Sequence, residues 1–125
     1  MTRQETTGVR DLAMSQWVRD KLPDSKTGFY TVTDLDFILY NYKYKKLMLV
    51  EVKTRKGRMS FSQRETLTLL DKIVKEGSIT SGIKYYGFHC IRFESTCFAD
   101  GRCMFDDKLI SETELIKTLS MVDHA

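Results

Sequence analysis

One short segment constrains the fold of this chain more than any other. The apolar run Leu47-Met48-Leu49-Val50 is followed directly by Glu51-Val52-Lys53. The apolar run predicts a central strand that is buried on both faces. Glu51 and Lys53 are two residues apart, so their side chains point to the same face of that strand. Charges at the end of a buried strand are costly unless they are paired or bind a metal. This break in the pattern is typical of a functional site, and the simplest alternative is an ion pair at an exposed strand end.

A second predicted strand, Asp36–Tyr42, supplies another carboxylate. Only residues 43–46 separate the two strands, so we expect them to pair as an antiparallel hairpin. A turn centred near Lys43-Tyr44 places Asp36 at the start of one strand beside Glu51 at the end of the next.

Two converging carboxylates suit a hard cation such as Mg²⁺, with Mn²⁺ as its substitute, and the backbone carbonyl of Val52 is a further candidate ligand. A metal held by Asp36 and Glu51 would polarise a phosphate oxygen and activate a water molecule, as phosphodiester hydrolysis requires. Lys53 would orient that water or stabilise the negative charge of the transition state. Asp34 faces the same way if the strand extends backward, and both readings, metal ligand and turn residue, stay open.

Periodicity predicts the remaining elements. The first helix has a possible capping box at Thr2 and Glu5 and ends before Pro23. Its inward-facing stripe is expected at Val9, Leu12, Ala13, Gln16 and Trp17. The second helix spans about 62–75, with Ser60 or Ser62 as its cap and Gly77 as its stop, and the third begins at Ser111. Further strands are predicted at 29–32, 85–93 and within 98–105. The chain is therefore expected to be a single α/β domain over residues 1–125, with a mixed sheet flanked by helices.

The segments Thr33–Leu39 and Leu47–Arg55 resemble the two motifs of the PD-(D/E)XK nuclease superfamily. The small size is similar to that of Holliday junction resolvases and VRR-NUC-type nucleases. The resemblance covers roughly residues 5–93, and Leu35 stands where the family usually has proline. It implies a restriction-endonuclease-like core of order αβββαβ, and a Mg²⁺-dependent endonuclease that hydrolyses DNA, with branched or structured DNA as a candidate substrate.

The resemblance also assigns roles to two further residues. Glu5 matches a metal-ligating glutamate in the first helix of many family members, although it equally suits the capping box. Gln63, ten residues after Lys53, matches a glutamine that many members carry near the catalytic residues. The alternative for Gln63 is an ordinary polar residue in the first turn of a helix.

The net charge of +3 permits nucleic-acid binding without demonstrating it. Lysine and arginine cluster between residues 43 and 64, and such clusters are often just a solvent-exposed face that binds no ligand. Arg55, Lys56 and Arg58 follow Lys53 directly and would contact the DNA backbone in the nuclease interpretation. The alternating residues Tyr40, Tyr42 and Tyr44 indicate core or interface packing more than stacking on bases.

No apolar run is long enough to span a membrane, so we expect a cytoplasmic, soluble protein. Three cysteines at spacings that fit no zinc site are expected to be reduced thiols. A single active site in so small a domain favours a homodimer if both DNA strands are cut. The main alternative from another class is a non-catalytic module that binds nucleic acid or protein on the same fold.

Overall fold

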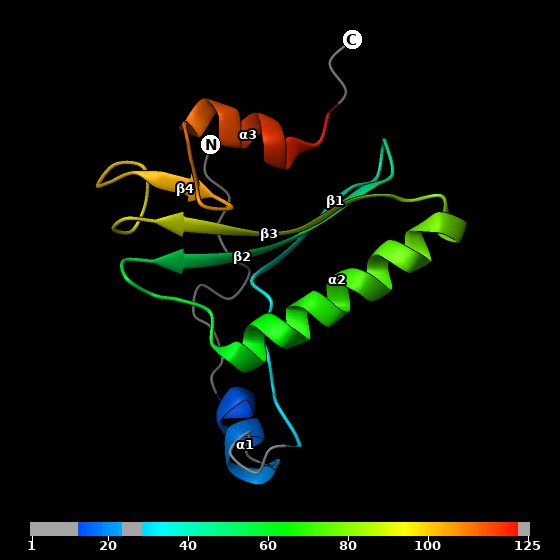
Figure 1. Cartoon of the computed structure of the whole chain (residues 1–125), viewed down its shortest axis with the longest axis vertical. Coiled ribbons are helices and arrows are strands. Elements are labelled where there is room, and N and C mark those ends of the chain that lie inside the picture. Colours follow the sequence, from blue (N-terminus) through cyan, green and yellow to red (C-terminus); the bar gives the residue numbers. More distant parts are fainter. Residues whose placement is uncertain (1–12, 24–28, 123–125) are drawn as a thin grey trace. The chain divides into compact units, whose positions relative to one another are not determined.

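The computed structural model describes residues 13–23 and 29–122, which belong to two compact units, Met1–Val32 and Thr33–Ala125 (Figure 1). The first unit contains α1 (Ala13–Lys21), which ends just before Pro23 as expected. None of its residues is buried, and Trp17 is 49% exposed, so the expected buried stripe is wrong for its described members. The described residues of this unit offer α1 no second helix or sheet against which to pack. The single domain over residues 1–125 stays a prediction.

The second unit has an α/β architecture built on one mixed sheet. Its strands pair in the order β1-β2-β3-β4-β5, and β2 with β3 is the parallel pair. The elements are β1 (Phe37–Asn41), β2 (Lys46–Thr54), α2 (Phe61–Ser81), β3 (Lys84–Phe93), β4 (Cys103–Phe105), β5 (Lys108–Ile110) and α3 (Glu112–Ser120). This confirms the expected α/β class with a mixed sheet flanked by helices.

The expected order αβββαβ is wrong at its first strand, because residues 29–32 form no strand. Their β-forming side chains are insufficient by themselves, since β propensity reflects packing against neighbouring strands. The three-stranded meander is therefore replaced by the β1–β2 hairpin. Two short strands, β4 and β5, follow β3 where the sequence predicted one.

The β1–β2 hairpin has the register expected from its turn. Phe37 pairs with Val50 and Tyr40 pairs with Leu47 in the antiparallel ladder. β2 lies between β1 and β3, and Met48 and Val50 are buried, as predicted for a central strand. The hairpin therefore aligns the residue before β1 with the polar end of β2.

The helix after this strand is longer than expected. Ser60 caps α2 by accepting a hydrogen bond from the backbone N–H of Gln63 at 3.1 Å. The predicted stop at Gly77 is wrong, because the helix continues to Ser81 and ends at Gly82, whose φ is 78°. A glycine adopts this left-handed conformation without steric cost, which makes Gly82 the effective stop.

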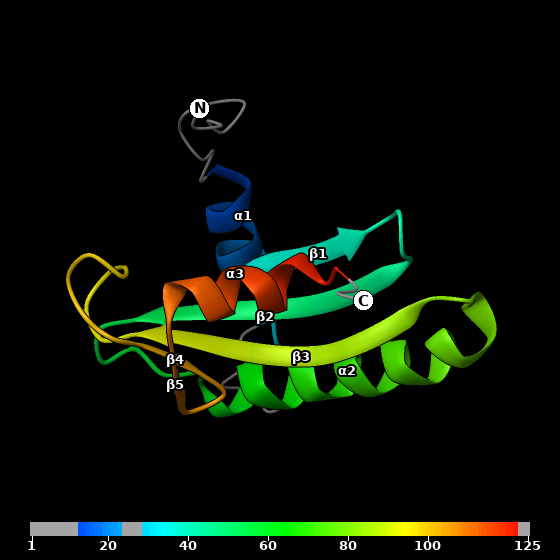
Figure 2. The same cartoon turned by 90° about the horizontal axis from the view of Figure 1, so that it is seen from above.

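Two helices cover opposite faces of the sheet (Figure 1). On one face, Leu115 of α3 packs with Val50 and Ile91 in the buried core. The predicted cap at Ser111 is present as a full capping box with Glu114. On the other face, α2 runs alongside β3 (Figure 2) and buries Leu67.

Among the described residues, no helix has the length and apolar character that crossing a bilayer requires. Cys90, Cys97 and Cys103 are free thiols, as expected.

Candidate functional site

The open end of the β1–β2 hairpin holds Asp36 and Glu51 side by side. The backbone N–H of Asp36 donates to Oε1 of Glu51 at 3.2 Å. The backbone N–H of Val52 donates to Oδ2 of Asp36 at 2.8 Å. Each carboxylate is thus anchored by the backbone of the opposite chain segment, and this exchange fixes the two acidic side chains relative to each other.

Glu51 is the buried centre of this cluster, with only 3% of its surface exposed. Its Oε2 accepts a hydrogen bond from Nε2 of Gln63 at 2.6 Å and forms an ion pair with Nζ of Lys53 at 3.0 Å. These contacts offset the cost of burying a carboxylate. Gln63 reaches Glu51 because the cap at Ser60 sets where α2 begins. Four residues predicted from the sequence, Asp36, Glu51, Lys53 and Gln63, therefore meet in one hydrogen-bonded group.

The carboxylates keep lone pairs available for a cation. A carboxylate oxygen can accept about two hydrogen bonds. Oδ1 of Asp36 has no hydrogen-bond partner within the described residues, and Oε1 of Glu51 has only the N–H of Asp36. The N–H and C=O of one strand residue point to the same side of the strand, so the Val52 carbonyl faces the Asp36 side as well.

This donor set fits Mg²⁺, which is commonly bound through one or two carboxylates and keeps several of its waters. Within residues 13–23 and 29–122, no group of three or more His, Cys, Asp or Glu side chains is placed to hold a metal. Two carboxylates together with water and a backbone carbonyl thus remain the candidate ligands. Glu5 lies outside the described residues, and Asp34 is exposed ahead of β1 and forms no hydrogen bond with Asp36 or Glu51 among the described residues.

The parallel pairing of β2 with β3 adds two residues that the sequence did not single out. Cys90 is the partner of Glu51, and Arg92 is the partner of Lys53. Burial raises the pKa of the Cys90 thiol, while Arg92 acts in the opposite direction. The sequence predicted a strand over 85–93 but not its register against β2, which depends on the intervening α2. The alternation of apolar and polar residues within 85–93 indicated a strand, and it was the only sequence signal for these two residues.

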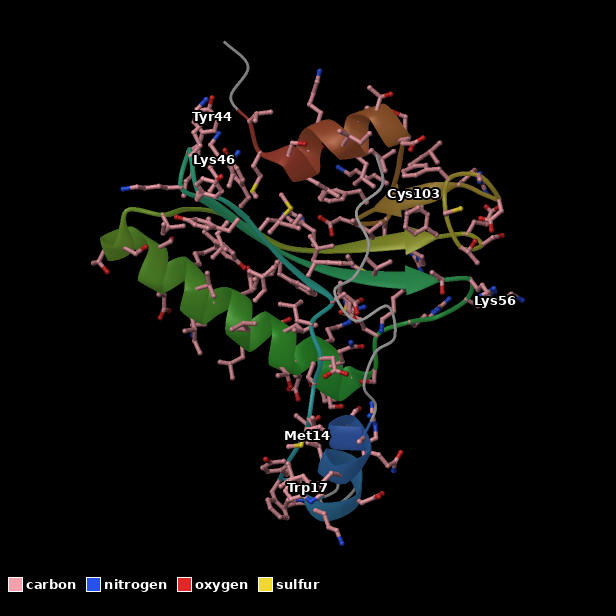
Figure 3. All side chains as sticks on the ribbon, turned by 180° about the vertical axis from the view of Figure 1, so that it is seen from behind. Met14, Trp17, Tyr44, Lys46, Lys56 and Cys103 are labelled. Carbon is pink, nitrogen blue, oxygen red and sulfur yellow. The ribbon has the colours of Figure 1, made fainter. Side chains whose placement is uncertain are left out.

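The predicted DNA-binding residues Arg55, Lys56 and Arg58 lie on the loop between β2 and α2, and Lys56 extends from this loop (Figure 3). The loop is held by a hydrogen bond from the N–H of Arg55 to the carbonyl of Ser95 at 2.9 Å. Glycine is favoured at position 57, because a Cβ there would make a tight contact, 3.0 Å, with the carbonyl oxygen of Thr54. The three cations are therefore presented from a fixed turn next to Lys53.

The tyrosines of the hairpin do not pack in the core. Tyr40, Tyr42 and Tyr44 are all exposed, so core packing is wrong for them, and an interface role stays a prediction. Tyr44 lies with Lys46 at the β1–β2 turn, at the other end of β2 from Lys56 (Figure 3). Lys46 is buried, and its ammonium lies 5.5 Å from the centre of the Tyr86 ring. The β1–β2 turn is thus remote from the carboxylate cluster.

Comparisons of this chain with protein-family models, with curated proteins and with solved structures found no match. The functional argument therefore rests on the residues and contacts of the cluster itself.

Proposed function

We propose that this chain is a Mg²⁺-dependent deoxyribonuclease that hydrolyses phosphodiester bonds, with branched or structured DNA as its candidate substrate. One observation carries the proposal: a buried Glu51 is bonded at once to Lys53, Gln63 and the backbone of Asp36. The fold that we propose for it is the restriction-endonuclease-like core, with the β1–β2 hairpin and α2 supplying the site.

Each residue has a distinct role in this proposal. Asp36 and Glu51 would hold the cation, which when bound polarises the phosphate and lowers the pKa of a water. Lys53 places a compact positive charge beside Glu51, where it stabilises the charge that develops on the phosphate. Gln63 is a positioning residue, because its amide orients Glu51 and contacts no reacting atom.

The test is cleavage of junction, flap, linear and single-stranded DNA by the purified full chain with Mg²⁺ or Mn²⁺. We expect Asp36→Asn and Lys53→Gln to lower the cleavage rate by about 100-fold or more. Asp36→Asn keeps an oxygen that can accept the Val52 N–H, so the fold should survive the change. Lys72→Gln, on the exposed surface of α2, is the matched control and should cut like wild type.

A second measurement separates catalysis from binding alone. Calorimetric titration with Mn²⁺ should show heat for wild type and none for Asp36→Asn. DNA binding that persists in Asp36→Asn, without specific Mn²⁺ uptake or cleavage by wild type, would instead favour the non-catalytic module. Cleavage by Lys53→Gln at the wild-type rate would contradict the nuclease mechanism.

A further inference from the structure

A cavity of about 710 Å³ adjoins the carboxylate cluster at Lys53. Three arginines line it besides Lys53: Arg58 from the loop after β2, Arg64 from α2 and Arg92 from β3. Two carboxylates, Asp106 and Asp107, line the cavity as well, so its four cations outnumber its carboxylates by two to one. Within the described residues, none of these arginines forms an ion pair with Asp36 or Glu51.

A second cavity, of about 480 Å³, has two lining residues in common with the first. Arg58 and Arg92 line both cavities, so the two share a boundary. The second cavity is also lined by Arg55 and Lys56, and by Arg102 near the start of β4. Together the two cavities are lined by seven cations.

Lys53 is paired with Glu51, but some of the other cations form no ion pair within the described residues. Arg92 is paired with Asp107 and Arg102 with Glu94. Within the described part of the chain, Arg58 and Arg64 form no ion pair. Clustered cations raise the local positive potential and attract anions. Cations spread over two adjoining cavities are more than one phosphate group can contact, which favours a ligand with regularly repeated negative charge.

We propose that the two cavities form one groove that binds the phosphate backbone of a polynucleotide, with Arg64 and Arg92 as its contacts nearest Lys53. The inference rests on the proposed nuclease function, since the groove begins beside the candidate catalytic lysine. Asp107 is 84% exposed at its side chain and occupies Arg92 in the free protein. Exposed ion pairs are weak, so a substrate phosphate can take the place of Asp107 on Arg92.

The test is the salt dependence of binding to fluorescently labelled duplex DNA, measured by anisotropy in EDTA so that no cleavage occurs. We expect Arg64→Gln and Arg92→Gln each to weaken binding by about 5–10-fold at 0.1 M salt. The slope of log affinity against log salt should become shallower by about 1 for each change. Arg92→Lys should retain most of the slope, because it keeps a charge at that position.

Lys117→Gln is the control, because Lys117 belongs to α3 on the opposite face of the sheet and should leave binding unchanged. An unchanged slope in both glutamine variants would overturn the groove, as would an equal loss in Lys117→Gln or equal competition by polyglutamate. The glutamine variants are accepted only if their melting temperatures match wild type. If the protein binds DNA through this groove but never cuts it, the proposed nuclease function is refuted, whereas the proposed groove is still supported.

Discussion

Glu51 shows how one residue organises the site. Its side chain is buried, and its two oxygens accept from Asp36, Gln63 and Lys53. An unpartnered carboxylate in this position would be strongly destabilising. The same contacts orient the carboxylate, so folding and the proposed metal binding place the same demand on this residue.

Gln63 should therefore matter although it touches no substrate. Gln63→Met keeps the length of the side chain but removes the amide that donates to Glu51. We expect Mn²⁺ affinity and cleavage rate to fall by about 10–100-fold, the usual cost of losing a group that orients a metal ligand. Titration calorimetry would measure the affinity, with the exposed Glu65→Gln of the same helical turn as control. Wild-type Mn²⁺ affinity in Gln63→Met would show that the amide does not position Glu51.

The three thiols should differ in reactivity. Burial raises the pKa of Cys90 and of Cys103, so each has less thiolate at a given pH than an ordinary cysteine. Cys97 is exposed. Near pH 8, Ellman's reagent should give one fast phase from Cys97, while the slow phases accelerate only at higher pH. Cys97→Ser should remove the fast phase, and its persistence in that variant would contradict the assignment.

The α2 helix explains how the site is joined to the sheet. Its cap at Ser60 places Gln63 in the first turn, and its length carries the chain to the start of the parallel strand β3. Parallel strands require such a crossover. This crossover sets Arg92 beside Lys53, so one helix determines both the polar contacts of the cluster and the cation that adjoins it.

Two glycines of this helix should respond to alanine with opposite sign. Gly77 lies inside α2 with open space around its Cβ direction, so Gly77→Ala should stabilise the protein by about 0.5–1 kcal/mol. Gly82 has φ +78°, a conformation that alanine rarely adopts. Gly82→Ala should destabilise by about 1 kcal/mol. Urea unfolding would measure both, and a shift of the two midpoints in the same direction would contradict the observed end of α2.

At the scale of the whole molecule, the exposed face of edge strand β1 remains to be explained. Ile38 is 66% exposed and Tyr40 is 47% exposed on one face of β1, and Tyr42, in the turn that follows β1, is 83% exposed. We propose that a second copy of this chain covers these side chains, because the proposed nuclease, with one site per chain, would need two copies to cut both strands of a DNA duplex. This proposal retains the expected homodimer and the expected interface role of the tyrosines.

Light scattering would test the dimer. We expect a mass of two chains for wild type, and a shift toward one chain in the double variant Ile38→Ser, Tyr42→Ser, because it removes apolar surface from the interface. Ile79→Ser, at an equally exposed position on α2, is the control and should remain dimeric. A wild-type mass of one chain at every concentration would exclude this arrangement.

The hairpin and β3 show most clearly what could and what could not be predicted from the sequence. The short turn fixed the register of β1 against β2, so the meeting of Asp36 with Glu51 followed from local spacing. The predicted strand at 29–32 failed because a strand needs a neighbour, and no local pattern supplies one. The sequence did not predict that Cys90 and Arg92 lie beside the site, because the register of β3 against β2 depends on a parallel pairing of two strands that α2 connects.

The sequence by itself determined the α/β class, the hairpin and Asp36, Glu51 and Lys53 as candidates, because these follow from periodicity and short loops. Gln63 became a candidate only through the family resemblance. Only the tertiary structure decided that Gln63 bonds to Glu51 and that Arg64 and Arg92 line one cavity with Lys53. Those relations join segments separated by a helix crossover. Side-chain contacts of this kind depend on how α2 packs on the sheet, which is a property of the whole fold.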